Sequence, residues 1–212
     1  MANCSCDNVK FDGISSSYKR ILWVVIFINA FMFIIEFSAG FMANSKALQA
    51  DALDFLGDTL TYTITFLVIG HSVKWRSGAA LIKGISLLFM GLWVAGSTFY
   101  NVFFAQIPNE TIMGSIAISA FIANVVCALL LMRYRDGDAN VRSVWLCSRN
   151  DAINNLLVLI AAGVVYITQS HWPDLIVAFL MSIIFLHSAA LIIKQAWKEW
   201  RDADINQPCK IS

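Results

Sequence analysis

The sequence predicts an all-α membrane protein with six transmembrane helices and both termini in the cytoplasm, and three observations support this fold class. Apolar residues make up 58% of the 212 residues and charged residues only 14%, whereas soluble domains carry about 25% charged residues. Runs of about twenty apolar residues, the length that crosses a hydrocarbon core of roughly 30 Å, recur along the chain. The lysines and arginines between these runs lie almost entirely on one side of the predicted membrane.

Six apolar runs occupy most of the chain, and short polar connections with helix-breaking residues separate them. The predicted helices are 21–43, 47–72, 82–104, 112–132, 144–167 and 173–194. We expect a cytoplasmic segment at 1–20, the transmembrane domain at 21–194 and a short cytoplasmic tail at 195–212. The first run is too long for the core of a cleaved signal peptide, so we expect it to remain in the protein.

The positive charges sort by side when the N-terminus is placed in the cytoplasm, and a cytoplasmic excess of Lys and Arg sets the orientation of membrane proteins. Only Lys46 falls outside, and Arg149 lies within the fifth helix. The residues on the inner side are Lys10, Lys19, Arg20, Lys74, Arg76, Lys83, Arg133, Arg135, Arg142, Lys194, Lys198, Arg201 and Lys210. The net charge of +1 offers no basic surface for nucleic acid. We therefore expect an integral protein of a lipid bilayer, in a bacterial inner membrane.

Three aspartates lie on one face of the second predicted helix. A charge in the bilayer core is costly unless it has a partner, so ionisable residues in spanning helices are candidates for function. Asp51, Asp54 and Asp58 stand at i, i+3 and i+7, a spacing that directs all three carboxylates the same way. Because like charges repel, this face needs a cation or protons. Asp51 lies nearest the outer end of its helix and also fits a helix cap, a partner of a neighbouring polar group, or a residue that lines the approach from outside.

The fifth predicted helix carries a second polar face, with Cys147, Asp151 and Asn155 at i, i+4 and i+8. Carboxylates with one thiolate suit Zn²⁺ and neighbouring transition ions, and a tetrahedral site needs four donors. The predicted ligand set is Asp54, Asp58, Cys147 and Asp151, with Asp51 and Asn155 as additional candidates. Cys147 also fits a small apolar filler. Because carboxylates bind either a metal or protons, one such site can exchange the two ions.

Other polar residues leave alternatives open. Arg149 either neutralises an aspartate or reaches outward, and Glu36 with Asn29 can tie helices together. Cys4 and Cys6 either hand over cytoplasmic metal or are incidental thiols, and we favour the second because a Cys-x-Cys pair cannot complete a four-donor site. The odd number of five cysteines argues against a disulfide framework.

A pattern across the first two predicted helices resembles the opening of the cation diffusion facilitator family. Its residues here are Asn29, Phe33, Glu36, Gly40, Ser45, Ala47, Leu48, Asp51, Ala52, Asp54 and Asp58. The resemblance continues through Trp172, Pro173 and Asp174 and covers residues 20 to 200. In that family the second and fifth helices each supply His or Asp, three residues and then Asp as metal ligands. The resemblance implies that the pairs here are Asp54 with Asp58 and Cys147 with Asp151.

The resemblance also implies what the protein does. Members of the family use the inward proton gradient to drive Zn²⁺, Co²⁺, Cd²⁺, Mn²⁺ or Fe²⁺ out of the cytoplasm, usually as homodimers. Cys147 departs from the family pattern and leaves the preferred metal open. Most members continue into a cytoplasmic ferredoxin-like domain, whereas this chain stops soon after the sixth predicted helix. The sequence is therefore similar to the subgroup that lacks this domain, often labelled cobalt, zinc and cadmium resistance proteins.

We therefore expect a proton antiporter that exports divalent transition metals by alternating access and needs no cofactor besides its transported metal. Asp54, Asp58 and Asp151 would hold the ion, and Cys147 would tune selectivity. The alternative is a non-transporting membrane scaffold or regulator on a degenerate transporter fold, against which the three carboxylates argue. We do not expect an enzyme, because the sequence has no His-Glu-x-x-His motif of a metalloprotease.

Overall fold

The chain forms a helical bundle, which confirms the predicted all-α fold class. The computed structural model describes residues 15–68, 73–104, 106–135 and 139–205, and within these ranges it contains helices and no strand. The elements are α1 (Ser16–Met42), α2 (Lys46–Val68), α3 (Val73–Phe104), α4 (Glu110–Leu131), the 3-10 helix η1 (Met132–Tyr134), α5 (Ala139–Thr168) and α6 (Trp172–Ile205).

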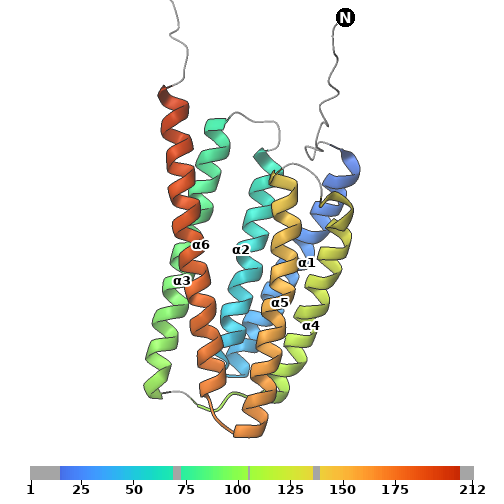
Figure 1. Cartoon of the computed structure of the whole chain (residues 1–212). Coiled ribbons are helices and arrows are strands. Elements are labelled where there is room, and N and C mark those ends of the chain that lie inside the picture. Colours follow the sequence, from blue (N-terminus) through green and yellow to red (C-terminus); the bar gives the residue numbers. More distant parts are fainter. Residues whose placement is uncertain (1–14, 69–72, 105, 136–138, 206–212) are drawn as a thin grey trace, which may run out of the picture.

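Neighbouring helices run up and down, so that α1 begins and α6 ends at the same end of the bundle (Figure 1). We call this the terminal end. The opposite end, where Ala43, Asn44 and Ser45 connect α1 to α2, is called the turn end. Because the helices pass along the bundle an even number of times, the first helix begins and the last helix ends at the same end.

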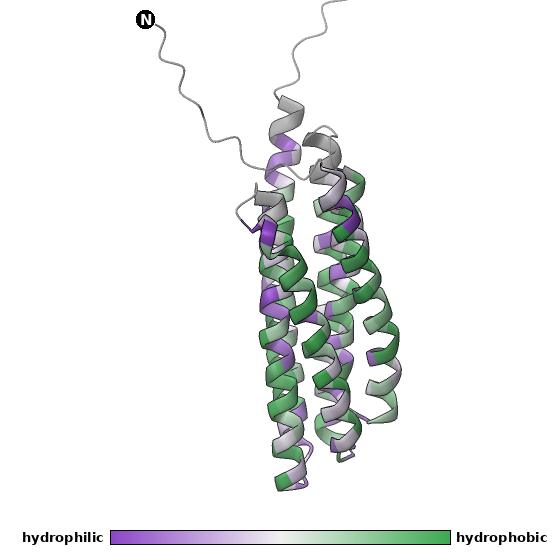
Figure 2. Ribbon diagram, turned by 90° about the vertical axis from the view of Figure 1, so that its right-hand side faces the viewer, coloured by the Kyte–Doolittle hydropathy of each residue, from purple (hydrophilic) through white to green (hydrophobic). Residues whose placement is uncertain are grey.

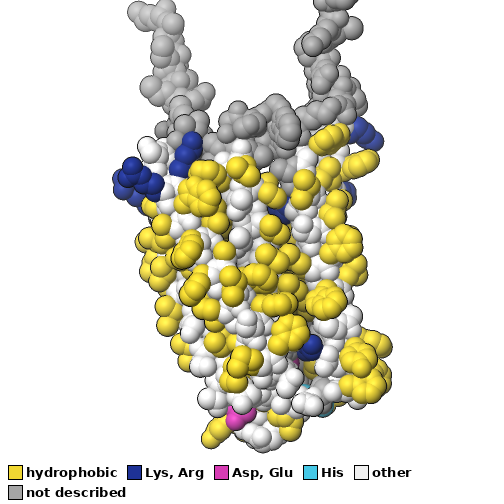
Figure 3. All heavy atoms as spheres, turned by 180° about the vertical axis from the view of Figure 1, so that it is seen from behind, with side chains coloured by type: hydrophobic (Ala, Val, Ile, Leu, Met, Phe, Trp, Pro, Cys, Tyr) yellow, Lys and Arg dark blue, Asp and Glu magenta, His cyan; other side chains and the backbone are white. Residues whose placement is uncertain are grey.

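Five of the described helical segments are long and apolar enough to cross a membrane, namely Ser16–Met42, Ala80–Phe104, Glu110–Tyr134, Val144–Thr168 and Trp172–Arg201. Hydrophobic residues extend along most of the helices (Figure 2). Large apolar side chains are spread over the face shown in Figure 3, where Lys and Arg gather mostly near the terminal end. Phe27, Phe89 and Trp93 are 71%, 69% and 63% exposed, as expected for side chains in contact with lipid.

The remaining helix, α2, carries three aspartates and is not among these five segments of the described residues. Its 23 residues give it a length of about 35 Å, enough to cross the hydrocarbon core. It packs against α1, α3, α5 and α6. Its polar face is therefore covered by protein, which is where intramembrane charges are tolerated.

Several helices extend beyond the predicted spans. α3 begins at Val73 and α5 at Ala139, where the sequence predicted 82 and 144. α6 continues to Ile205, so part of the predicted tail at 195–212 is helical. Apolar patterning marks the stretch of a helix in the lipid core, whereas backbone hydrogen bonding continues into the polar flanks. Residues 69–72 of the second predicted helix lie outside the described residues.

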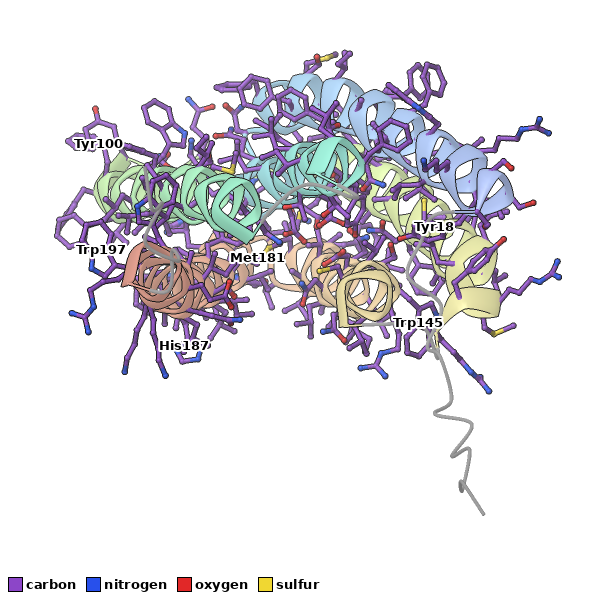
Figure 4. All side chains as sticks on the ribbon, turned by 90° about the horizontal axis from the view of Figure 1, so that it is seen from above. Tyr18, Tyr100, Trp145, Met181, His187 and Trp197 are labelled. Atoms are coloured by element: carbon purple, nitrogen blue, oxygen red, sulfur yellow. The ribbon has the colours of Figure 1, made fainter. Side chains whose placement is uncertain are left out.

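Two groups of helices make up the bundle. α3 and α6 pack tightly together beside a group formed by α1, α2, α4 and α5 (Figure 4). Two glycines of α3 allow this close approach, because a Cβ at Gly84 would lie 2.6 Å from a side-chain atom of Ile193 and one at Gly91 would lie 3.0 Å from Leu186. Small residues commonly bring membrane helices close in this way.

The two largest clusters of buried apolar residues lie in opposite halves of the bundle. The turn-end cluster comprises Ala43, Ala47, Leu48, Ala50, Leu53, Val94, Met113, Ala117, Val158, Ala161, Ala162, Ala178, Met181 and Phe185. The terminal-end cluster comprises Tyr18, Leu22, Val25, Ile26, Tyr62, Cys127, Leu131 and Val144. Among the described residues, α3 and α6 contribute to the turn-end cluster but not to the terminal-end cluster. The described residues of the α3–α6 pair therefore join the common core at the turn end.

Asp174, in the first turn of α6, holds the start of α2. Its Oδ1 accepts hydrogen bonds from Ser45 Oγ at 2.6 Å and from the backbone N–H of Ala47 at 3.1 Å. Its Oδ2 accepts one from the backbone N–H of Lys46 at 2.7 Å. The first N–H groups of a helix lack partners within the helix and carry partial positive charge, so a carboxylate satisfies both needs. This contact joins α6 to α2 and fixes where the acidic face of α2 begins.

Candidate metal centre

Two polar faces meet inside the bundle between α2 and α5, where oxygen atoms gather in Figure 4. The two helices run in opposite directions, so the order of residues along one mirrors the order along the other. Asp54 is an electrostatic neighbour of Asp58, and its side chain contacts Asp151 and Asn154. Asp151 is in turn a neighbour of Cys147. The described helices thus bring the three predicted carboxylate ligands together. Cys147, the fourth predicted ligand, lies beside them.

The three carboxyl groups are shielded from the surroundings. Asp58 is 8% exposed and Asp151 is 9% exposed, while Asp54 is half-buried. Oδ2 of Asp54 and Oδ2 of Asp151 have no hydrogen-bond partner among the described residues. Buried acceptors without donors are costly, and carboxylates this close repel one another unless they bind protons or a cation. The arrangement is therefore suited to binding a positive charge.

The carboxylates are neighbours and do not form a closed cage. Within the described part of the chain, no three His, Cys, Asp or Glu side chains are gathered closely enough to form a coordination sphere. A bound Zn²⁺ requires its ligand atoms at about 2.0 to 2.3 Å. The side chains would have to move toward a common point to hold such an ion.

Cys147 and Asn155 lie on either side of Asp151 along α5. Cys147 is a half-buried free thiol and an electrostatic neighbour of Asp58 and Asp54. It lies on the side of the terminal end. Asn155 is fully buried, and neither polar atom of its amide has a hydrogen-bond partner within the described residues. An unpaired buried amide beside crowded carboxylates is a further available donor of ligand oxygen.

Asp51 lies against Glu36 of α1. The two side chains are 1% and 0% exposed and adjoin across the α1–α2 contact, and none of their oxygens has a hydrogen-bond donor among the described residues. Asp51 is therefore not a helix cap. The side-chain amide of Asn29 donates a hydrogen bond to the carbonyl oxygen of Val25 at 2.8 Å, and its nitrogen lies 3.9 Å from Cys127 Sγ. Glu36 thus connects α1 to α2, whereas Asn29 connects α1 to α4.

Three residues that adjoin this centre were not among the predicted site residues. The hydroxyl of Tyr62 donates a hydrogen bond to Asp58 Oδ2, and Ser148 Oγ lies 3.4 Å from that hydroxyl. Lys83 of α3 is an electrostatic neighbour of Asp58 and Cys147. Helical spacing could have indicated Tyr62, which stands four residues after Asp58 on the same face. Lys83 belongs to another helix, and no local signal connects it to the centre.

Arg149 points away from the carboxylates. Its guanidinium lies 5.3 Å from the centre of the Trp145 ring, and its Nη2 donates to Asn150 Oδ1 at 3.1 Å. Of the two alternatives for Arg149, the outward orientation is the one that the structure has. The thiols of Cys4 and Cys6 lie outside the described residues.

The class of protein follows from these features. Helices with apolar outer faces surround an acidic interior with unpaired oxygens, and ionisable residues placed inside a membrane bundle mark ion pathways. The fold and the site are those of an integral membrane protein of the transporter class. The family model for the cation efflux transmembrane domain matches residues 22–199. The chain belongs to this cation efflux family, which confirms the resemblance to cation diffusion facilitators.

Curated relatives carry names of metal transporters. The chain is similar to the zinc transporter ZitB of Yersinia pestis, with 26% identity over 91% of this chain and 67% of the relative. It is also similar to the cadmium, cobalt and zinc/H(+)-K(+) antiporter of Bacillus subtilis strain 168, with 24% identity over 84% of this chain and 62% of the relative. A third relative is the zinc transporter ttm-1 of Caenorhabditis elegans, with 25% identity over 83% and 50%. The chain spans about two thirds or less of the length of these relatives.

Proposed function

We propose that this protein exports divalent transition metals of the Zn²⁺, Co²⁺ and Cd²⁺ type from the cytoplasm in exchange for protons. The observation that carries the proposal is the meeting of Asp54, Asp58 and Asp151 inside the bundle, where Oδ2 of Asp54 and Oδ2 of Asp151 have no hydrogen-bond donor among the described residues. The names of the relatives support the same class of substrate.

The exchange follows from competition for the same oxygens. Asp54, Asp58 and Asp151 bind the cation as carboxylates, and each proton that reaches them removes a ligand charge and weakens metal binding. Cys147 adds a soft sulfur that favours Zn²⁺ and Cd²⁺ over hard cations. Asp51 and Asn155, nearer the turn end, are additional oxygen donors along the path. Protons arriving from one side therefore release the metal there.

Alternating access requires a site that opens to one side at a time, and the two halves of the bundle support this. All six helices or their connections pack together in the turn-end cluster, whereas no described residue of α3 or α6 belongs to the terminal-end cluster. Half-buried Asp54 and Cys147 suit an approach from the terminal end. A second state, packed at the terminal end and open at the turn end, would complete the cycle. The difference in ion affinity between the two states sets how much of each is populated.

The orientation that we propose places the terminal end in the cytoplasm. Lys19, Arg20, Arg133 and Arg201 belong to this end of the bundle by their places in the helices, and Lys46, at the start of α2, belongs to the turn end. The positive-inside rule then favours cytoplasmic termini. The bacterial relatives support a bacterial plasma membrane. We also propose a homodimer held by helix contacts, which crosslinking in lipid nanodiscs would test.

Transport by the purified protein in liposomes tests the function. A metal-sensitive dye inside the vesicles reports uptake of Zn²⁺, Co²⁺ or Cd²⁺ under an imposed proton gradient. We expect gradient-dependent uptake by the wild type and a loss of about 100-fold or more in Asp58→Asn and Asp151→Asn, because each removes a ligand charge.

Glu110→Gln is the matched control, since it neutralises an acidic residue in the first turn of α4 at the turn end. Its uptake should equal that of the wild type. Absence of uptake for every metal would contradict the proposal and favour the alternative of a non-transporting scaffold. Equal uptake by Asp58→Asn and wild type would show that the carboxylates are not the transport site.

A further inference from the structure

Tyr62 places a hydroxyl against the acidic centre from the side of the terminal end. It lies one turn beyond Asp58 on α2 and is 0% exposed. Its hydroxyl donates to Asp58 Oδ2, with Ser148 Oγ at 3.4 Å and the carbonyl oxygen of Val144 at 3.5 Å. The ring belongs to the terminal-end cluster, which packs α1, α2, α4 and α5 together. The phenol thus reaches from an apolar core to a carboxylate.

The direction of these hydrogen bonds follows from the groups involved. A phenol carries one proton, and the carboxylate of Asp58 is the strongest acceptor within its reach. Because that proton goes to Asp58, the contact between Ser148 and Tyr62 has Ser148 as its donor. Ser148 is itself 0% exposed. Two successive hydrogen bonds therefore run from Ser148 of α5 to Tyr62 and from Tyr62 to Asp58 of α2. The phenol oxygen accepts the first and donates the second.

The hydrogen bond changes what Asp58 can offer to an ion. With Oδ2 accepting from the phenol, Oδ1 is the carboxylate oxygen that this hydrogen bond leaves available for an ion. A carboxylate held in this way binds an ion through one oxygen and in one orientation. Four-coordinate Zn²⁺ uses such single-oxygen ligands, whereas larger cations take more oxygen donors and accept bidentate carboxylates.

A phenylalanine would fill the same volume in the terminal-end cluster. The hydroxyl is therefore not needed for packing. A buried hydroxyl needs hydrogen-bond partners, whereas a buried phenyl ring needs none. We propose that Tyr62 is a positioning residue that holds Asp58 as a single-oxygen ligand and thereby favours Zn²⁺ over the larger Cd²⁺. This inference rests on the proposed role of Asp58 as a cation ligand.

Binding measured by calorimetry tests the proposal with the full chain in lipid nanodiscs, using Zn²⁺ and Cd²⁺ as the probes. In Tyr62→Phe we expect the Kd for Zn²⁺ to rise about 10- to 100-fold, the usual effect of removing a hydrogen-bond partner of a metal ligand. The Kd for Cd²⁺ should rise less, so the preference shifts toward Cd²⁺. Ser148→Ala, which keeps the bond between Tyr62 and Asp58, should produce a smaller shift in the same direction.

Tyr166→Phe is the matched control, because this tyrosine of α5 is 66% exposed; its Kd values should match those of the wild type. An equal rise in both Kd values for Tyr62→Phe, or no rise, overturns the positioning role while Zn²⁺ binding by the wild type and its loss in Asp58→Asn leave the proposed function standing. No binding of either ion by the wild type removes the function and this inference together. Thermal unfolding of each variant confirms that the fold is retained.

Discussion

The two halves of this bundle are held in different ways. At the turn end, the connection between α1 and α2, the start of α2 and the start of α6 are joined by the hydrogen bonds of Asp174, and the apolar cluster draws on α2 to α6. At the terminal end, the corresponding cluster contains described residues of α1, α2, α4 and α5 only. The acidic centre lies between the two.

The difference teaches how a polar interior can be reached from one side. A half in which every helix packs into one cluster excludes ions, because each buried contact would have to be broken to admit them. A half in which the described residues of α3 and α6 take no part in the shared apolar cluster separates with fewer broken apolar contacts among those residues. The contrast between the halves is therefore a physical basis for access, and substitutions in each half should have different consequences.

The largest expected effect on stability comes from breaking the turn end. Asp174→Ala removes the acceptor of three hydrogen bonds and leaves two N–H groups and a hydroxyl buried without it, which should cost about 3 kcal/mol. The midpoint of thermal unfolding in detergent measures this loss. Asp174→Asn keeps one oxygen acceptor and should lose less. A midpoint equal to that of the wild type for Asp174→Ala would refute the role of this contact.

A smaller effect is expected in the α3–α6 pair toward the terminal end. A Cβ at Gly84 would stand 2.6 Å from Cγ1 of Ile193, so Gly84→Ala should destabilise the pair by about 1 to 3 kcal/mol through overpacking. Gly96 is on the same helix and has no atom within 4 Å of its added Cβ. Gly96→Ala should therefore leave stability unchanged or raise it by up to about 1 kcal/mol. Equal unfolding midpoints for the two variants would argue against close packing at Gly84.

The smallest expected effect concerns the backbone of the turn itself. Asn44 has a φ of 53°, a left-handed conformation that asparagine and glycine adopt more readily than β-branched residues. Asn44→Val should lower stability by about 1 to 2 kcal/mol, whereas Asn44→Gly should be close to neutral. Chemical denaturation of both variants would distinguish them. Similar losses in both would mean that the Asn44 side chain, and not its backbone, stabilises the turn.

The sequence alone predicted the features that depend on local spacing. Apolar runs of transmembrane length predicted the all-α fold, although the helices extend further than those runs at Val73 and Ile205. Helical periodicity also predicted which side chains share a face, as for Asp54 with Asp58. The metal-ligand role of these residues and of Cys147 stays a prediction, since binding depends on how closely the faces approach.

Contacts between distant segments were decided by the tertiary structure. Asp174 reaches residues more than 120 positions away, and Ser148 lies beside Tyr62 across 86 positions. Glu36 meets Asp51 because α1 packs along α2. Periodicity determines the direction of a side chain relative to its own helix axis, but the rotation and pairing of helices determine what it meets. The amino-acid sequence by itself therefore determined the spans and their polar faces, and only the packing of the helices decided which donors and carboxylates adjoin.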